Sequence, residues 1–265
     1  MISHLLHLES VGFLADGLAD WAAAATVLRG SADYHPQPLV VPPLARLPAA
    51  ERRRITPCIA LALAAVEQAL GERAQVADLQ YVFASSYGDM AIADALCRAL
   101  ALPDRPVSPT RFHNSVHNAP AGYWSLAAQT RAPATSICLE GGSLAAGLLE
   151  AVVQAVAEGV PVLLVAYEYP APAPLNRVVP LIGPCAVALV LAPAGNGPCL
   201  RVGGFEAARV SRLDNPLLEA LRTGNDAAQV LPLLKRVACA QPGPVWLPYL
   251  DDRALRIEMV AGDGG

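Results

Sequence analysis

The chain has 265 residues, of which 54% are hydrophobic and 16% charged, and its formal net charge is −4. This length suits one large or two small domains with an ample core, and no apolar run reaches the roughly 18 residues that a membrane span needs. Only Arg52, Arg53 and Arg54 form a basic cluster, so nucleic-acid binding has little support. The N-terminus lacks the charged region and long apolar core of a signal peptide, which predicts a soluble cytoplasmic protein.

The first hundred residues alternate between strand-like and helix-like patterns. We expect a strand at 11–17, a proline-rich surface loop at 33–48, a helix at 52–70, an apolar strand running into a Ser-Ser-Tyr-Gly turn at 79–89, and a helix at 90–100.

The rest of the chain continues this alternation. We expect a polar loop from 108 that becomes helical near Ala119, a strand at 135–139, a helix at 143–159, buried strands at 161–168 and 185–193, a strand at 199–208, short helices near 215–222 and 226–239, and a strand at 245–250. This order of elements predicts a mixed α/β sheet covered by helices on its faces.

The helix at 143–158 is apolar around almost its whole circumference. Its polar residues after Ser143 are Glu150, Gln154 and Glu158, which are spaced four apart and therefore form one narrow stripe. A helix of this kind is usually buried rather than docked on a surface. We therefore expect it to lie between layers of sheet.

The cysteines and histidines do not form a metal-binding pattern. The six cysteines are scattered, without a CxxC pair, which is typical of buried free thiols in a reducing compartment. His113 and His117 are four apart, but no Glu accompanies them and Pro120 follows closely, so hydrogen bonding within an ordered loop is the simpler interpretation. The residues indicate neither a metal nor a cofactor.

One long stretch resembles a known family. The run SPTRFHNSVHNAPAGYWSLAAQTRAPATSI, then a turn, an Ala-rich helix and AEGVPVLLVAYEY, resembles β-ketoacyl synthases of the thiolase superfamily. In that family a loop ending in Asn and Ala-Gly leads through a helix and an Ala-Pro to a strand, a catalytic Cys and a buried helix that ends in Gly. The corresponding positions here are Asn118, Ala121, Gly122, Ala132, Pro133 and Gly159.

Three other segments add to the resemblance, namely RRRITPCIALALAAVEQAL, VFASSYGD and GPCAVALVLAP. Together the similarity covers about residues 10–208. It implies a domain at 1–208 with the N-terminal half of a thiolase-like fold, a βαβαβαββ mixed sheet with a buried helix between layers. A reduced C-terminal α/β extension at 209–265 would pack on it.

Two departures from the family pattern concern catalysis. Counting from Ala132-Pro133 places the catalytic cysteine at Gly141, and counting back from Gly159 places it at Gly142, so no thiol stands there. The family's second half, with two His and a Lys, also has no counterpart, because no His follows residue 117. Claisen condensation needs a thiolate to carry the acyl chain and donors aimed at the developing oxyanion.

A chain without these groups resembles the chain length factors, which are ketosynthase relatives that lack the cysteine and pair with an active ketosynthase. The short form resembles the partner subunits of aryl polyene ketosynthases. The resemblance implies that the strand at 135–139 pairs across the dimer axis and that the preceding loop reaches the partner's acyl tunnel, while an acyl carrier protein serves the complex. The implied tunnel and interface residues are Arg111, Phe112, His113, Ser115, Trp124, Thr135, Ser136, Ile137, Cys138, Leu139 and Glu140.

Alternative roles remain open for residues beside the bend. Cys138 is the nearest thiol to the missing nucleophile. Ser143 lies in a GGSLA sequence that lacks the second glycine of a nucleophile elbow, because Ala145 stands there, and it fits a helix N-cap better. Glu140 could cap the following helix or reach across an interface. Phe112 and Trp124 could be core aromatics.

Two rival functions follow from these alternatives. The first is a free-standing acyltransferase or hydrolase on a truncated thiolase fold, with Cys138, Ser143 or Glu140 in its site. The second is a self-associating module that binds acyl chains or a carrier protein.

Overall fold

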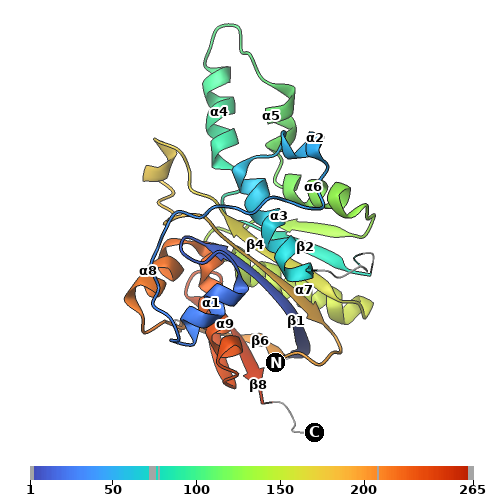
Figure 1. The fold of residues 1–265 in the computed structure, drawn as a ribbon, viewed down its shortest axis with the longest axis vertical. Helices are drawn as coiled ribbons and strands as arrows, with labels where there is room; N and C mark the ends of the chain where they lie inside the picture. Colours follow the sequence, from blue (N-terminus) through green and yellow to red (C-terminus); the bar gives the residue numbers. More distant parts are fainter. Residues whose placement is uncertain (1–2, 72–75, 77, 208, 262–265) are drawn as a thin grey trace.

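The computed structural model describes residues 3–71, 76, 78–207 and 209–261. The strands of this part of the chain form one mixed sheet in the order β3-β2-β4-β5-β1-β6-β8-β7 (Figure 1). They are β1 (His4–Ala15), β2 (Gln80–Ala84), β3 (Ala134–Ile137), β4 (Val162–Glu168), β5 (Cys185–Ala192), β6 (Cys199–Ala207), β7 (Gly243–Pro248) and β8 (Arg253–Val260).

Helices cover both faces of the sheet, while α4 and α5 project beyond it (Figure 1). The helices are α1 (Trp21–Leu28), α2 (Ala49–Arg52), α3 (Pro57–Leu70), α4 (Met90–Leu100), α5 (Pro109–Asn114), α6 (Ala119–Ala128), α7 (Ser143–Glu158), α8 (Pro216–Gly224) and α9 (Leu231–Ala238), with 3₁₀ helices η1 (Leu175–Arg177) and η2 (Asp226–Val230). The predicted mixed α/β sheet with helices on its faces is confirmed.

The two faces of the sheet carry two separate hydrophobic cores. Successive residues of β4 belong to opposite cores, since Leu164 packs with α7, α9 and α1 whereas Val165 packs with α3 and α6. This alternation is what the two-residue period of a strand requires. Because both faces are covered, β4 and β5 are buried along their whole length and read as continuous apolar runs.

Several expectations differ from the structure. The strand expected at 11–17 is β1, which begins at His4 and ends at Ala15, and helix α1 was not expected. The helix expected at 52–70 is divided, because Thr56 caps a new helix through Ile59 N at 3.2 Å and Pro57 occupies its first position. The polar loop expected from 108 contains the short helix α5, which Ser108 caps. The strand β8 was not expected at all, because its charged residues alternate with apolar ones only over a short stretch.

Helix α7 has sheet on one side only. Its inner side packs against β2 and β4, where a Cβ on Gly147 would come within 2.9 Å of Ala84 and Leu164. Its outer side leaves Val153 58% exposed and Val156 43% exposed. The second layer of sheet that its composition led us to expect is not present among the described residues. The sequence indicates two apolar sides of the helix, but it does not indicate which chain covers the second.

The residues after 208 continue the same sheet. Strand β8 pairs with β6, and β7 forms the edge strand beyond it. Helix α9 and η2 cover this end of the sheet on the α7 side. None of the described helices is both long enough and apolar enough to span a membrane.

Candidate functional site

The carboxyl ends of three strands meet at one place in the sheet. Strand β2 runs parallel to both β3 and β4, so all three end at the same edge. They are followed by the turn at 85–88, by the bend at 139–142 and by the loop after Glu168. Loops at this edge of parallel strands are the usual location of binding and catalytic groups in α/β proteins.

Buried hydrogen bonds join these three strand ends. The backbone N–H of Ser86 donates to the Glu168 carboxyl group. The Ser86 hydroxyl lies 3.1 Å from both Leu139 O and Ser143 Oγ. The Ser143 hydroxyl donates to Leu139 O and accepts from Leu139 N, both at 2.8 Å. Ser143 therefore ties the bend together instead of capping α7 as predicted, and its hydroxyl is fully engaged.

Glu168 is a buried acid at the centre of this arrangement, with 1% of its surface exposed. Burial raises its pKa to about 8, and the nearby carboxylate of Asp226 adds to the effect, while the hydrogen bond from Ser86 N opposes it. The second carboxyl oxygen, Oε2, has no hydrogen-bond partner among the described residues. Glu168 is therefore neutral over most of the physiological pH range.

The two glycines of the bend disfavour a side chain for different reasons. A Cβ on Gly141 would meet nothing within 4 Å, so only the backbone conformation opposes a side chain there. Gly141 has a φ of +70°, a conformation that side chains disfavour. Gly142 has an ordinary φ of −134°, but a Cβ there would overlap the carbonyl oxygen of Tyr249. Tyr249 follows β7, so the C-terminal part of the chain occupies the space next to the bend.

We expect Gly142→Ala to destabilise the fold by roughly 1–3 kcal/mol, because the new methyl group must displace the backbone at Tyr249. The matched control is Gly122→Ala in α6, where a Cβ meets nothing within 4 Å and helix propensity predicts stabilisation of up to about 1 kcal/mol. Urea denaturation measures both changes. An unchanged stability for Gly142→Ala would show that the space beside Tyr249 opens at little cost.

Cys138 lies just before the bend and is exposed. Its Sγ donates to the Ser86 carbonyl oxygen at 3.3 Å. Partial burial, with a smaller contribution from Glu168, raises the pKa of the thiol. A reactive cysteine needs the opposite shift, because the thiolate is the nucleophile.

We accordingly expect Cys138 to react with iodoacetamide more slowly than free cysteine does at the same slightly alkaline pH. Mass spectrometry of the peptide that contains Cys138 measures this rate, and a Cys138→Ser variant assigns the label. Rapid labelling near neutral pH would instead indicate an activated nucleophile and would favour a free-standing enzyme.

The predicted tunnel residues of the preceding loop lie on or beside α5. Arg111, His113 and Ser115 are exposed, and Phe112 exposes 64% of its surface. The His113 ring meets Tyr123 edge-on at 6.1 Å, and the Ser115 hydroxyl donates to Phe112 O at 2.8 Å. This segment thus presents an aromatic ring and cationic groups to whatever lies outside the chain.

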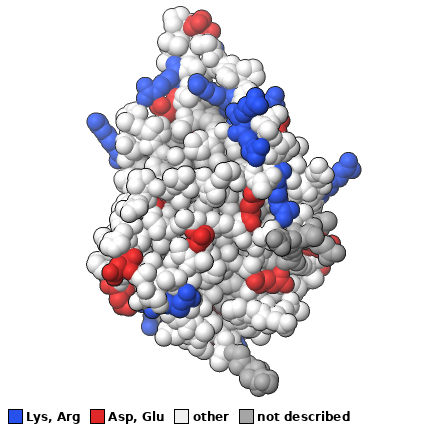
Figure 2. Space-filling view, viewed as in Figure 1, with Lys and Arg blue, Asp and Glu red and all other residues white. Residues whose placement is uncertain are grey.

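The segment is anchored by Asn114, a buried residue that sequence reasoning missed. Its side-chain amide donates to Arg54 O at 2.7 Å and accepts from the Tyr123 hydroxyl at 2.9 Å. Figure 2 shows Lys and Arg gathered over α2 and α5, where Arg52, Arg53 and Arg54 are exposed. Asn114 thereby holds the exposed face of α5 beside this basic surface.

The predicted place of Trp124 at the tunnel is corrected by the structure. Trp124 is 1% exposed, and its ring packs edge-on against Tyr81 with a centroid distance of 6.1 Å. Helix α6 turns this side toward β2, so Trp124 is a core residue. The sequence did not reveal which side of α6 would face the sheet, because apolar residues occur on all of them.

Strand β3 forms an edge of the sheet among the described residues. Thr135, Ser136, Ile137 and Leu139 are half-buried, and Thr135 Oγ1 accepts a hydrogen bond from Gln154 of α7 at 2.9 Å. These side chains therefore lie where an added strand would cover them.

Glu140 is exposed at the end of this segment, and α7 has no side-chain cap. Glu140 therefore makes no capping hydrogen bond to α7, whose N-cap residue is Gly142. Burial raises the pKa of Tyr87, and the charges of Asp226, Glu168 and, last, Glu140 add to this effect.

A small cavity of about 130 Å³ adjoins the turn after β2, with Cys58, Tyr87, Asp89 and Tyr167 in its wall. His117 also lines it, and its Nε2 lies 3.1 Å from Ser85 O. Ligand pockets usually measure about 300–1,000 Å³, so this cavity alone is too small for a long acyl chain. Within the described ranges, no three His, Cys, Asp or Glu side chains are grouped to hold a metal ion.

Two other important residues were missed by sequence reasoning. Glu168 gave a signal, because it is a single carboxylate ending an apolar strand, PVLLVAYE. For Tyr249 the sequence contains no such signal, because this residue acts through a backbone oxygen that any residue possesses. Only the packing of β7 against the bend reveals its role.

Comparison with solved structures identifies the same fold in several ketosynthase complexes. One match is to a chain of the ketosynthase ApeO in complex with its chain length factor ApeC from Xenorhabdus doucetiae, with 22% identity, a TM-score of 0.74, and coverage of 96% of this chain and 98% of that one. A chain of the ishigamide ketosynthase/chain length factor matches with 14% identity, a TM-score of 0.72 and coverage of 97% and 99%.

A third match is to a chain of AntDE:AntF, a type II polyketide synthase acyl carrier protein in complex with its ketosynthase bound to the hexaketide. It has 12% identity, a TM-score of 0.76 and coverage of 98% and 100%. A search of curated proteins returned no match. The thiolase-like fold expected from the sequence resemblance is thus confirmed.

The sequence comparison agrees with the fold. The family described as β-ketoacyl synthase, N-terminal domain, matches residues 20–240, which is most of the chain. The strand, bend and helix α7 at its centre are those on which the resemblance rested. The chain therefore belongs to the β-ketoacyl synthase N-terminal domain family.

Proposed function

We propose that this chain is a non-catalytic, chain-length-factor-like subunit of a β-ketoacyl-ACP synthase complex. It pairs with an active, cysteine-bearing ketosynthase and shapes the acyl tunnel during elongation of a polyene, fatty acid or polyketide chain in the cytoplasm. The observation that carries this proposal is the bend at Gly141 and Gly142. It has no thiol, and the Tyr249 carbonyl oxygen fills the space that a side chain on Gly142 would need.

The two edges of the sheet support the pairing. At β7, the outward N–H of Trp246 already donates to Ser211 Oγ at 3.0 Å, and Pro244 and Pro248 have no N–H. At β3, no described strand lies beyond the edge. Open strand edges are templates for pairing with another chain, and natural proteins usually block them. The blocked β7 and open β3 favour strand addition at β3.

The exposed apolar side chains of α7 also favour a partner at the β3 edge of the sheet. Val153 and Val156 of α7 are exposed. Gln154, which lies between them, donates a hydrogen bond to Thr135 of β3, so these two valines lie near the open edge. On the other side of the sheet, Phe112 is exposed on α5. In the proposed heterodimer, Phe112 borders the partner's acyl tunnel, and the exposed arginines near α2 face an acidic carrier protein.

The deciding experiment is coexpression with the cognate cysteine-bearing ketosynthase, followed by native mass spectrometry. We expect a one-to-one heterodimer, with condensation activity that depends on the partner's cysteine. Recovery of the two proteins as separate species would contradict the proposal. A stable homodimer that ignores the ketosynthase would favour a self-associating module that binds acyl chains or a carrier protein.

A further inference from the structure

A basic pocket lies at the β7 edge of the sheet, at the opposite edge from β3. Its volume is about 240 Å³, and Arg212, Lys235 and Arg236 line it together with Gln241 and Trp246. No Asp or Glu contributes to the lining. Three cations around one pocket stand out in a chain whose formal net charge is −4.

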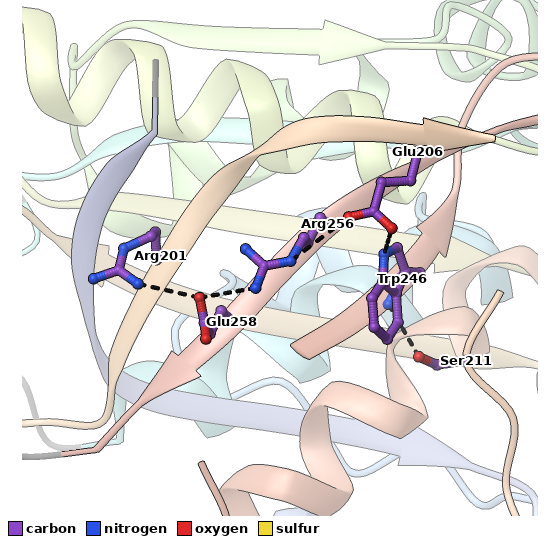
Figure 3. Close-up of polar contacts among 6 residues, drawn as sticks. All are labelled: Arg201, Glu206, Ser211, Trp246, Arg256 and Glu258. Carbon is purple, nitrogen blue, oxygen red and sulfur yellow. Dashed lines mark hydrogen bonds and ion pairs between the residues drawn. The ribbon is translucent and has the colours of Figure 1, made fainter. Parts of the chain in front are cut away.

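The backbone on either side of Arg212 is fixed. Ser211 N donates to Trp246 O at 3.0 Å, and Trp246 N donates to Ser211 Oγ at 3.0 Å, as Figure 3 shows for the second bond. Leu213 N donates to Glu219 Oε2 at 2.9 Å. Arg212 is therefore held at the pocket, yet its exposed side chain makes no hydrogen bond or ion pair within the described part of the chain.

The charge of Arg236 is also uncompensated. Its Nε donates to Pro244 O and its Nη1 to Pro242 O, both at 3.0 Å, which orients the guanidinium without a carboxylate. Lys235 pairs with Asp214 at 2.9 Å, but the Asp214 side chain is 96% exposed, so solvent screens this pair strongly. The pocket thus presents three cations, of which Arg236 is oriented by backbone carbonyl groups. The neighbouring carboxylates Asp214 and Glu219, which interact with Lys235 and Arg212, lie outside its lining.

The neighbouring sheet face offers an instructive contrast (Figure 3). There Arg201 and Arg256 both pair with Glu258, at 3.1 and 3.0 Å, and Arg256 also lies 3.8 Å from Glu206. Cations on that face are matched with carboxylates. On the other side of the same two-stranded edge, Lys235 is paired with Asp214, whereas Arg212 and Arg236 have no carboxylate within ion-pair distance among the described residues.

We propose that this pocket binds the phosphate or pyrophosphate group of a small organic phosphate. Guanidinium groups match phosphate oxygens in charge and in geometry, and Arg212 and Arg236 supply free N–H donors beside the ammonium of Lys235. This site is independent of the proposed ketosynthase partnership, because it lies at the blocked edge of the sheet.

The test is isothermal titration of the full chain with inorganic pyrophosphate at low ionic strength. We expect saturable one-site binding that weakens as salt is added. Arg212→Gln and Lys235→Gln should each weaken it roughly tenfold, as expected for the loss of one charged hydrogen bond. The matched control is Arg105→Gln, which removes the same charge from the loop between α4 and α5 at the other end of the molecule (Figure 1) and should leave the affinity unchanged.

Absence of saturable binding, or an equal loss in Arg105→Gln, would overturn the proposal. The thermal unfolding midpoints of the variants establish that each is folded before titration. Adenosine diphosphate serves as a second probe. Saturable binding of adenosine diphosphate that Arg212→Gln weakens supports a site for organic phosphates, and binding of pyrophosphate alone rules out the organic part of the ligand.

Discussion

The substitution Ser136→Pro is expected to weaken the heterodimer by about tenfold or more without unfolding the chain. Tyr81 N donates to Pro133 O and Ser85 N donates to Ile137 O, so residues 133, 135 and 137 face β2. In a parallel pair this leaves the N–H of Ser136 pointing outward. Proline at this position removes one donor from the open edge and none from the internal ladder, and proline is tolerated in edge strands.

Native mass spectrometry and titration with the ketosynthase measure the effect, and we expect affinity to fall by about tenfold or more. The control Ser136→Ala keeps the N–H and should bind normally. The Ser136 hydroxyl has no hydrogen-bond partner among the described residues, so removing it should change the stability of the isolated chain little. Undiminished binding by Ser136→Pro would mean that the partner does not add a strand at β3.

The second large effect concerns pH and Glu168. Its pKa is about 8 in the folded chain, against an ordinary value of 4.5, so folding takes up a proton between these values. Because the pKa of Glu168 is raised in the folded state, its contribution to the free energy of unfolding is fully present below pH 4.5 and is lost as pH rises to about 8. We expect the free energy of unfolding to fall by up to about 5 kcal/mol across this window.

The groups around Glu168 do not obscure this window. Burial raises the pKa values of Cys58, Tyr167 and Cys138 above their ordinary ranges, which already lie at higher pH. The carboxylate of Asp226 acts by raising the pKa of Glu168. The pH dependence between 4.5 and 8 therefore reports chiefly on Glu168 at this site.

Urea denaturation at several pH values tests the prediction with Glu168→Gln, which keeps an acceptor for Ser86 N but cannot ionise. This variant should show a much flatter pH dependence and should be more stable than the wild-type chain at the alkaline end. Glu140→Gln is the matched control, because Glu140 is exposed near the same site. Parallel pH profiles for Glu168→Gln and the wild-type chain would show that Glu168 is not buried as a neutral acid.

Most elements could be located from the amino-acid sequence because their signals are local. The helix at 90–100 coincides with α4, and the strands at 161–168 and 185–193 differ from β4 and β5 by one residue. Apolar periodicity and capping residues act over a few positions, so they are readable without the fold. Helix α5 was missed because it is short and partly polar, and strand β8 because charged residues interrupt its apolar pattern. Helix α1 was missed as well.

The candidate site was predictable in part for a similar reason. Spacing along the chain was sufficient to place two glycines at the bend, and therefore to predict the loss of a nucleophile. It was not sufficient to distinguish Phe112, which is exposed, from Trp124, which is buried. Both are aromatic residues in one segment, and only the packing of α6 on β2 separates them.

By itself, then, the sequence determined the family, the order of strands and helices, and the absence of a thiol at the bend, because these depend on residue type and spacing. The tertiary structure alone decided that Tyr249 closes the space at Gly142, that Glu168 is a buried neutral acid, and that Arg212 and Arg236 share a pocket. These features arise between residues far apart in the chain. Their physical basis is contact and burial, which no local pattern encodes.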